Sequence, residues 1–158
     1  MSIQWKRLCC AALLLAALAA LSGCGLYGDT TPTMSPDAVR QALVGKTWML
    51  RRIVARKFDD DPARTLKFNA DGSVEGFGGC NNFRGKYTLE GDDLTFGPLA
   101  TTHKSCGPAL DEQEYTFLTT LAKIRTLRIE EDGSELTLIT ENQGEMLLTS
   151  GDSGGLFW

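Results

Sequence analysis

This sequence contains very little histidine and no block of basic residues, and both shortages limit the chemistry open to it. His103 is the single histidine of 158 residues, so a catalytic or metal site would depend on one imidazole and scattered carboxylates. Acidic residues outnumber basic ones by 20 to 16. A chain with this excess of acids lacks the positively charged surface that nucleic-acid binders use. We therefore expect neither an enzyme nor a nucleic-acid partner.

The sequence also lacks an apolar run long enough to cross a membrane. Leu8–Leu21 contains only Leu, Ala and Cys, and as a helix it spans roughly 21 Å against about 30 Å for a bilayer core. Because Lys6 and Arg7 precede it, the pattern is typical of a signal peptide. The segment 21–24, Leu-Ser-Gly-Cys, resembles the bacterial lipobox. We therefore expect residues 1–23 to be cleaved and Cys24 to carry acyl chains, including palmitate.

This lipid anchor implies a cellular location. One acyl chain binds a membrane only weakly, and stable anchoring needs a second chain or a basic patch. The several acyl chains expected on Cys24 therefore suffice. Gly25, and not Asp, follows Cys24, and the usual sorting pattern then favours the outer membrane. We expect the domain to face the periplasm.

Of the five cysteines, Cys9 and Cys10 leave with the signal peptide and Cys24 is expected to be acylated, so two remain in the rest of the chain. Cys80 and Cys106 would meet an oxidising periplasm, which favours a disulfide between them. Buried reduced thiols are an alternative, and a redox pair is another, although the usual Cys-x-x-Cys spacing is absent. His103 lies close to Cys106 in sequence, but a zinc site needs further ligands that are not apparent. We predict no metal and no cofactor.

Changes in composition divide the chain after the signal. Residues 24–35 are rich in Gly, Thr and Pro and predict a flexible tether. Residues 36–149 form the predicted domain, and 150–158 a C-terminal tail ending in Leu-Phe-Trp. The tail contains the string Gly-Asp-Ser-Gly-Gly known from serine proteases, but the chain is too short for such a protease.

The domain combines one short helix, one longer helix and several short strands. A short helix is expected from Pro36, with Ser35 as its cap, and a longer one over 109–122, where apolar residues form a single stripe. Alternating patterns and turn signals predict strands over 47–54, 65–68, 73–77, 86–90, 94–96, 127–129, 135–139 and 145–148. We expect an α+β fold: a strongly bent antiparallel sheet, or incomplete β-barrel, of seven to eight short strands with one principal helix packed on it.

Two further motifs have simple structural explanations. The acidic run 59–61 lacks the alternating spacing of a calcium loop, so an acidic turn is the simpler interpretation. Gly78-Gly79 and Asn81-Asn82 suggest left-handed backbone more than a phosphate-binding loop, because no Lys-Ser or Lys-Thr pair follows.

Three segments together resemble the META domain family, which includes the heat-shock protein HslJ. They are Gly45–Leu50, Phe68–Tyr87 with its Gly-Gly-Cys-Asn-Asn-Phe-Arg-Gly-Lys-Tyr run, and Leu94–Cys106. Glu114, Phe117 and Leu121 extend the match, whereas Lys104 and Ser105 stand where the family often has Met. The resemblance implies a small α+β domain and an envelope or stress-related role, and members occur as lipoproteins. No enzymatic activity is established for the family.

Our first functional hypothesis is a non-enzymatic outer-membrane lipoprotein that binds an envelope partner through the mouth of the barrel or an exposed edge. A second is a carrier of a small apolar ligand inside the half-barrel. A third is an inhibitor of a lytic enzyme in the envelope. The sequence identifies none of the contacting residues.

Overall fold

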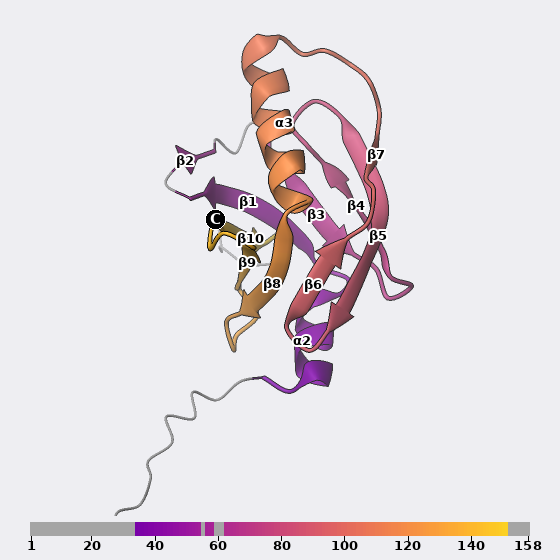
Figure 1. The fold of residues 1–158 in the computed structure, drawn as a ribbon, viewed down its shortest axis with the longest axis vertical. Coiled ribbons are helices and arrows are strands. Elements are labelled where there is room, and N and C mark those ends of the chain that lie inside the picture. Colours follow the sequence, from indigo (N-terminus) through magenta and orange to yellow (C-terminus); the bar gives the residue numbers. More distant parts are fainter. Residues whose placement is uncertain (1–33, 55, 59–61, 152–158) are drawn as a thin grey trace, which may run out of the picture. The chain divides into compact units, whose positions relative to one another are not determined.

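A computed structural model describes residues 34–54, 56–58 and 62–151 (Figure 1). The predicted signal peptide, Cys24, nearly all of the predicted tether, the acidic run 59–61 and the terminal Leu-Phe-Trp lie outside the described residues. The elements are α2 (Pro36–Leu43), β1 (Thr47–Ile53), β2 (Arg56–Lys57), β3 (Thr65–Phe68), β4 (Ser73–Phe77), β5 (Asn82–Glu90), β6 (Asp93–Phe96), β7 (Ala100–Thr101), α3 (Pro108–Leu121), β8 (Ile124–Ile129), β9 (Glu135–Thr140) and β10 (Glu145–Ser150). Neither α2 nor α3 is both long and apolar enough to cross a membrane.

The strands form one antiparallel sheet that closes on itself. The order is β10-β9-β8-β6-β5-β4-β3-β1, and β10 also pairs with β1, from Trp48 opposite Ser150 to Ile53 opposite Met146. The α+β class and the strongly bent antiparallel sheet are confirmed, but the eight-stranded barrel is closed where we expected it to be incomplete. Pairing of the first and last long strands removes the exposed edges that an open sheet would leave.

Two very short strands lie beside this ring. β2 pairs with the end of β1, and β7 pairs with the start of β5. The sequence analysis missed both, because two residues are too few to show a period. It also began β5 at Lys86, whereas β5 begins at Asn82 and pairs with β4 along its first half.

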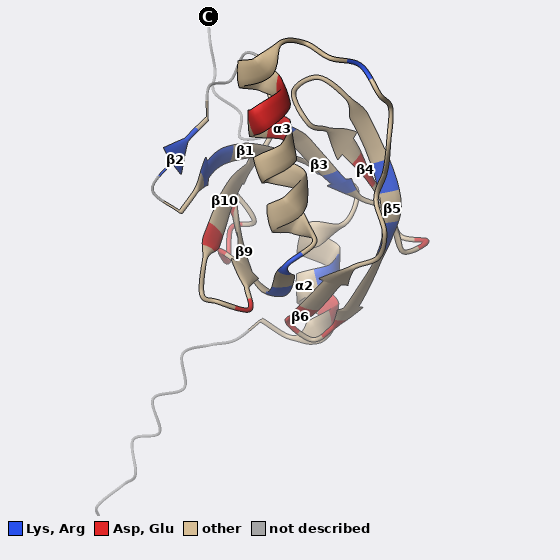
Figure 2. Cartoon of the chain, turned by 45° about the horizontal axis from the view of Figure 1, so that its top comes forward, with Lys and Arg blue, Asp and Glu red and all other residues tan. Residues whose placement is uncertain are grey.

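The joins around the barrel differ in strength. β1 and β10 share five aligned Cα pairs, interrupted by one bulge. β6 and β8 share only one, Asp93 opposite Thr126, supported by a 2.9 Å bond from the Leu127 N–H to the Asp92 carbonyl. Figure 2 shows α3 in front of the barrel interior, with β9 and β10 on one side and β4 and β5 on the other.

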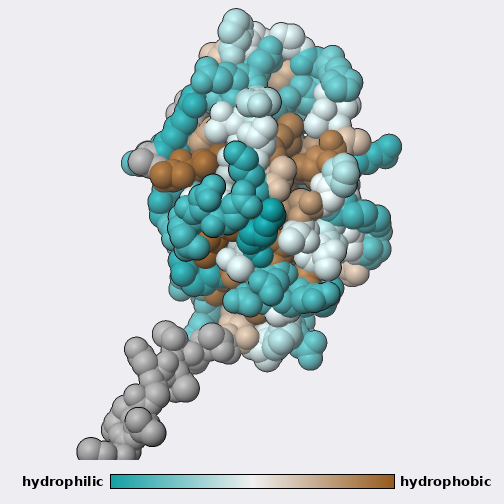
Figure 3. Space-filling view, viewed as in Figure 1, coloured by the Kyte–Doolittle hydropathy of each residue, from teal (hydrophilic) through white to brown (hydrophobic). Residues whose placement is uncertain are grey.

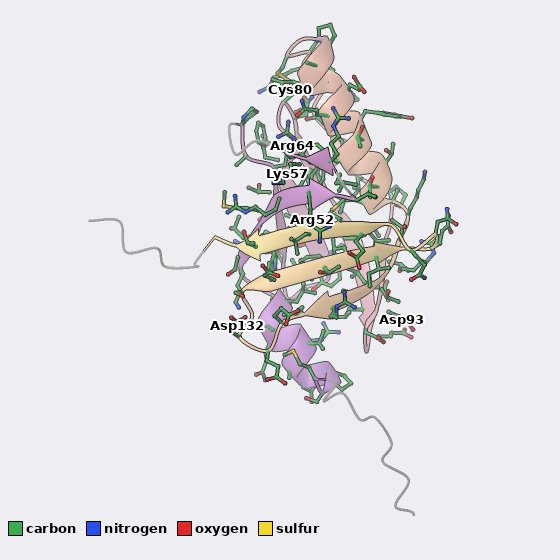
Figure 4. The ribbon with its side chains drawn as sticks, turned by 90° about the vertical axis from the view of Figure 1, so that its left-hand side faces the viewer. Arg52, Lys57, Arg64, Cys80, Asp93 and Asp132 are labelled. Atoms are coloured by element: carbon green, nitrogen blue, oxygen red, sulfur yellow. A yellow bond between two sulfur atoms is a disulfide. The ribbon has the colours of Figure 1, made fainter. Side chains whose placement is uncertain are left out.

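Apolar side chains from the strands and both helices fill the interior. Trp48 is fully buried, and its indole N–H donates to the Leu43 carbonyl at 3.0 Å, which ties β1 to the end of α2. α3 contributes Phe117 and Leu121, and the Phe117 ring meets Phe83 edge-on at 5.8 Å. α2 and α3 lie at opposite ends of the domain (Figures 1 and 4). The barrel is therefore a packed core.

Candidate functional site

The two predicted cysteines lie at the α3 end of the domain. Cys80 and Cys106 form a disulfide with Cα atoms 5.8 Å apart and a sequence separation of 26. Cys80 is buried, whereas Cys106 is exposed in the segment that leads into α3. The bond therefore ties the β4–β5 connection to the segment between β7 and α3.

A buried carboxylate connects the same two segments to the helix. Glu114 on α3 is 8% exposed, and its Oε2 accepts from the Cys80 and Asn81 backbone N–H groups at 3.0 and 2.5 Å. Its Oε1 accepts from Asn81 Nδ2 at 2.7 Å. Asn81 Oδ1 in turn accepts from Thr102 Oγ1 and the Lys104 N–H, both at 2.8 Å. We call these residues, Cys80, Asn81, Thr102, Lys104 and Glu114, the Glu114 network.

The glycines before Cys80 make room for this network. Gly79 has a φ of 112°, as the predicted left-handed backbone requires. Gly78 is needed for space instead, because a Cβ there would lie 2.7 Å from Glu114 Oε2. Asn81 and Asn82 do not have positive φ. Asn81 serves through its side-chain amide, a role that the sequence analysis did not identify.

Arg64 is a second buried charged residue near this end, and the sequence contained no signal for it. It is 2% exposed, donates to the Gln113 side-chain carbonyl of α3, and lies 5.1 Å from the Phe58 ring. Figure 4 shows Arg64 and Cys80 at the α3 end, with Asp93 and Asp132 toward the other. Arg64 therefore helps to hold α3 over the barrel.

His103 is exposed on the segment between β7 and α3. Across residues 34–54, 56–58 and 62–151, no three His, Cys, Asp or Glu side chains gather closely enough to hold a metal ion. His103 also lines neither of the two hollows described next.

A groove of about 580 Å³ crosses the outer face of the barrel. Its lining comes from β1, β3, β4, β5 and β7 and the residue after β7: Thr47, Thr65, Lys67, Glu75, Gly76, Phe77, Asn82, Phe83, Arg84, Ala100, Thr101 and Thr102. A second hollow of about 470 Å³ shares Glu75, Arg84 and Ala100 with it and adds Lys86. We call the two together the outer groove.

Strand register places the charges of the outer groove in one row. Lys67 lies opposite Glu75, and Glu75 opposite Arg84, so the signs alternate from β3 to β5, as the coloured segments in Figure 2 show. Within the described part of the chain, none of these three side chains has an ion pair or hydrogen bond. Elsewhere on the barrel, Glu145 pairs with both Arg52 and Arg128, at 4.0 and 3.6 Å. The charges of Lys67, Glu75 and Arg84 are therefore available to a ligand.

The neighbouring row of the groove is uncharged. Thr65 lies opposite Phe77, and Phe77 opposite Asn82. Phe77 faces outward and is half-buried. The row thus offers a hydroxyl, an aromatic face and an amide side by side. Exposed apolar surface occurs elsewhere as well: Val54, directly after β1, is 58% exposed, and brown apolar surface is visible on the face drawn in Figure 3.

Two exposed carboxylates at the margins of these sites have lowered pKa values. The Ser73 hydroxyl and N–H donate to Asp71 and lower its pKa, helped by Lys86, which lies 3.8 Å away. Ser105 Oγ and the Cys106 N–H likewise lower the pKa of Asp111 at the start of α3. Both carboxylates remain ionised at neutral pH.

Comparison with known proteins adds one family and several structures. The family model described as META domain matches residues 41–153. No curated protein matches the chain. A protein from Burkholderia xenovorans solved by NMR is similar at 24% identity and a TM-score of 0.61, over 74% of this chain and 88% of that one. A DUF4847 family protein from Bacteroides vulgatus is similar at 11% identity and a TM-score of 0.54, over 70% and 96%. These two likenesses show the fold alone.

Proposed function

Because this chain belongs to the META domain family, we propose that it is a non-enzymatic outer-membrane lipoprotein whose domain binds a partner in the cell envelope and supports envelope integrity under stress. The basic start, the apolar run and the lipobox-like Leu-Ser-Gly-Cys before Gly25 support the anchor on Cys24. Anchoring by acyl chains leaves the whole folded domain available for binding.

The outer groove is the observation that supports the binding role. Lys67, Glu75 and Arg84 form one row in it and have no ion pair or hydrogen bond among the described residues, whereas Arg52 and Arg128 on the β1 and β8 surface are paired with Glu145. Exposed charges arranged in a fixed pattern steer a partner of complementary charge and select it. The groove is therefore a better binding surface than the barrel mouth, which α3 covers.

The interior supports surface binding more than the carriage of an apolar ligand. Trp48, Leu66, Phe68, Leu136 and Leu138 are fully buried and fill the barrel. Both described hollows lie outside it, and eight of the twelve residues that line the 580 Å³ groove have polar side chains. Carriers of apolar molecules instead enclose an apolar cavity.

The anchor can be tested on the full chain expressed in a Gram-negative host. We expect acyl mass on Cys24, loss of residues 1–23 and recovery of the protein with the outer membrane. Cys24→Ser keeps the same domain but should remain unprocessed and lose this fractionation. An unmodified Cys24 in the processed protein would contradict the proposal.

The binding role can be tested by complementation of a deletion strain under envelope stress. Wild type and Arg128→Ala should restore growth, whereas Arg84→Ala should not at equal abundance. Both substitutions remove one exposed arginine from the barrel surface, so the comparison isolates the groove. Equal rescue by the two variants would count against partner binding through this face.

A further inference from the structure

We propose that the outer groove binds a linear glycan whose amino sugars carry carboxylate-bearing substituents, which is the chemistry of a bacterial cell-wall strand. The juxtaposition that indicates this ligand is the Lys67–Glu75–Arg84 row beside the Thr65–Phe77–Asn82 row. The inference rests on the proposed envelope function, because it names the class of partner for the same groove.

The groove offers no long free strand edge to a polypeptide, because β7, which pairs with β5 alone, is two residues long. β3 is paired with β1 and β4, and β5 is paired with β4 and, at Phe83 and Arg84, with β7. Recognition by adding a strand requires an unpaired edge. A ligand in the groove must therefore be recognised by side chains that project from the sheet.

These side chains match the surface of a sugar chain. Thr47, Thr65 and Thr101 provide hydroxyl groups, and Asn82 provides an amide. Together they can form hydrogen bonds with the hydroxyl and acetamido groups of amino sugars. The Phe77 ring can receive the C–H face of a sugar, because the face of an aromatic ring is negative.

The charge of the groove calls for carboxylates on that glycan. The chain has a formal net charge of −4, yet Lys67, Arg84 and Lys86 face the single acid Glu75 in the outer groove. Lys86 is already paired with Asp71 at 3.8 Å. Lys67 and Arg84 are thus the two cations available to a ligand. The Arg84 guanidinium can donate two parallel hydrogen bonds to one carboxylate.

The size and support of the groove suit a polymer. It crosses five neighbouring strands, which spans roughly 19 Å at about 4.8 Å per strand, long enough for several sugar rings. Its β7 rim is tied down, since Thr102 Oγ1 donates to Asn81 Oδ1 at 2.8 Å and the Thr102 N–H donates to the Asn82 carbonyl at 3.0 Å. A rim held in this way loses little freedom on binding.

The test is co-sedimentation of the full chain, solubilised in detergent, with purified peptidoglycan sacculi. We expect wild type to bind, with the bound fraction decreasing as salt increases. Lys67→Ala/Arg84→Ala should weaken binding about tenfold or more, whereas Arg125→Ala/Arg128→Ala, which removes two cations from β8, should leave it unchanged.

Phe77→Ala should weaken binding, and Tyr115→Ala, at a 70% exposed aromatic residue on α3, should not. Absence of sedimentation, or equal loss in both double variants, would overturn the glycan site.

Two competitors identify the ligand. Soluble peptidoglycan fragments that keep their sugars should displace the protein from sacculi, and hexaglutamate at the same concentration should not. If hexaglutamate displaces it equally well, the groove is a site for acidic peptides and the inference is wrong. The salt series uses only wild type, so it tests the proposal even if a variant fails to fold.

The outcome separates this inference from the proposed function. If wild type does not sediment with sacculi while Arg84→Ala still fails to complement the deletion strain, the partner is not a glycan but the envelope function stands. If sacculus binding depends on the groove while Arg84→Ala complements fully, the glycan site stands and the stress role is wrong.

Discussion

At the residue scale, Glu114 does more for the structure than its position on a helix surface would indicate. A buried carboxylate is unfavourable unless hydrogen bonds replace its water, and Glu114 has three N–H donors from Cys80 and Asn81. It thereby fixes the connection between β4 and β5. The Gly-Gly-Cys-Asn run is needed because its backbone must approach this carboxylate closely.

Glu114→Gln should lower the free energy of unfolding by about 2 kcal/mol or more, because one buried acceptor becomes a donor that faces N–H groups. Urea denaturation measures this change. Glu112→Gln is the matched control on the same helix: Glu112 is exposed and pairs with Arg56 at 3.9 Å, so its loss should cost little. Similar losses in the two variants would show that the Glu114 bonds do not stabilise the fold.

Ser105→Ala should raise the pKa of Asp111 toward its ordinary value, because the Ser105 hydroxyl is the main cause of the lowered pKa. Carboxyl titration by NMR measures it, with Asp132, held by Ser134, as the unchanged control. A carboxylate whose pKa is lower in the folded state stabilises the folded protein at pH values above its unfolded-state pKa, near 3.8. This stabilisation is lost as the pH falls through the pKa of the folded state. The variant should therefore lose less stability than wild type below about pH 4. An unchanged Asp111 pKa would contradict the assignment.

At the scale of elements, α3 is held over the barrel by attachments at both of its ends. The disulfide and the Glu114 network act near its start, and Phe117 and Leu121 pack further along. The segment from β7 to α3 is otherwise exposed, with His103, Lys104 and Ser105 all facing solvent. The covalent bond therefore limits how far this segment can move from the barrel.

Cys80→Ala/Cys106→Ala should lower the free energy of unfolding by roughly 3 kcal/mol in the chain-entropy model for a loop of this length, measured by urea denaturation. The double variant should be insensitive to reductant, whereas wild type in reductant should match the variant. A loss well below 1 kcal/mol would show that the unfolded chain gains little freedom when the loop is opened.

At the scale of the whole molecule, the barrel is closed by two joins of unequal extent. The β1–β10 join brings together residues from the two ends of the domain over five Cα pairs, whereas β6 and β8 share one. Strand separation should begin where fewest bonds must break.

Hydrogen exchange should therefore report the β6–β8 join first. The Leu127 amide, which donates across this join to Asp92, should exchange faster than the Met49 and Thr149 amides, which lie opposite each other in the β1–β10 join. NMR-detected exchange near neutral pH measures these rates. Equal protection of the two joins would mean that the barrel opens only by global unfolding.

The sequence by itself determined the local elements and the pairing partners that lie close in the chain. Alternation and turn residues such as Asp71-Gly72 predicted the hairpins, and an apolar stripe predicted α3. The two cysteines left in the domain, with the expectation of an oxidising location, favoured the Cys80–Cys106 bond. Each prediction depends on neighbouring residues or on cysteine count. Only the tertiary structure decided closure through β1 and β10, the burial of Glu114 against Asn81, and the Lys67–Glu75–Arg84 row. These features depend on register and contacts between residues far apart in the chain, for which single-sequence periodicity contains no signal.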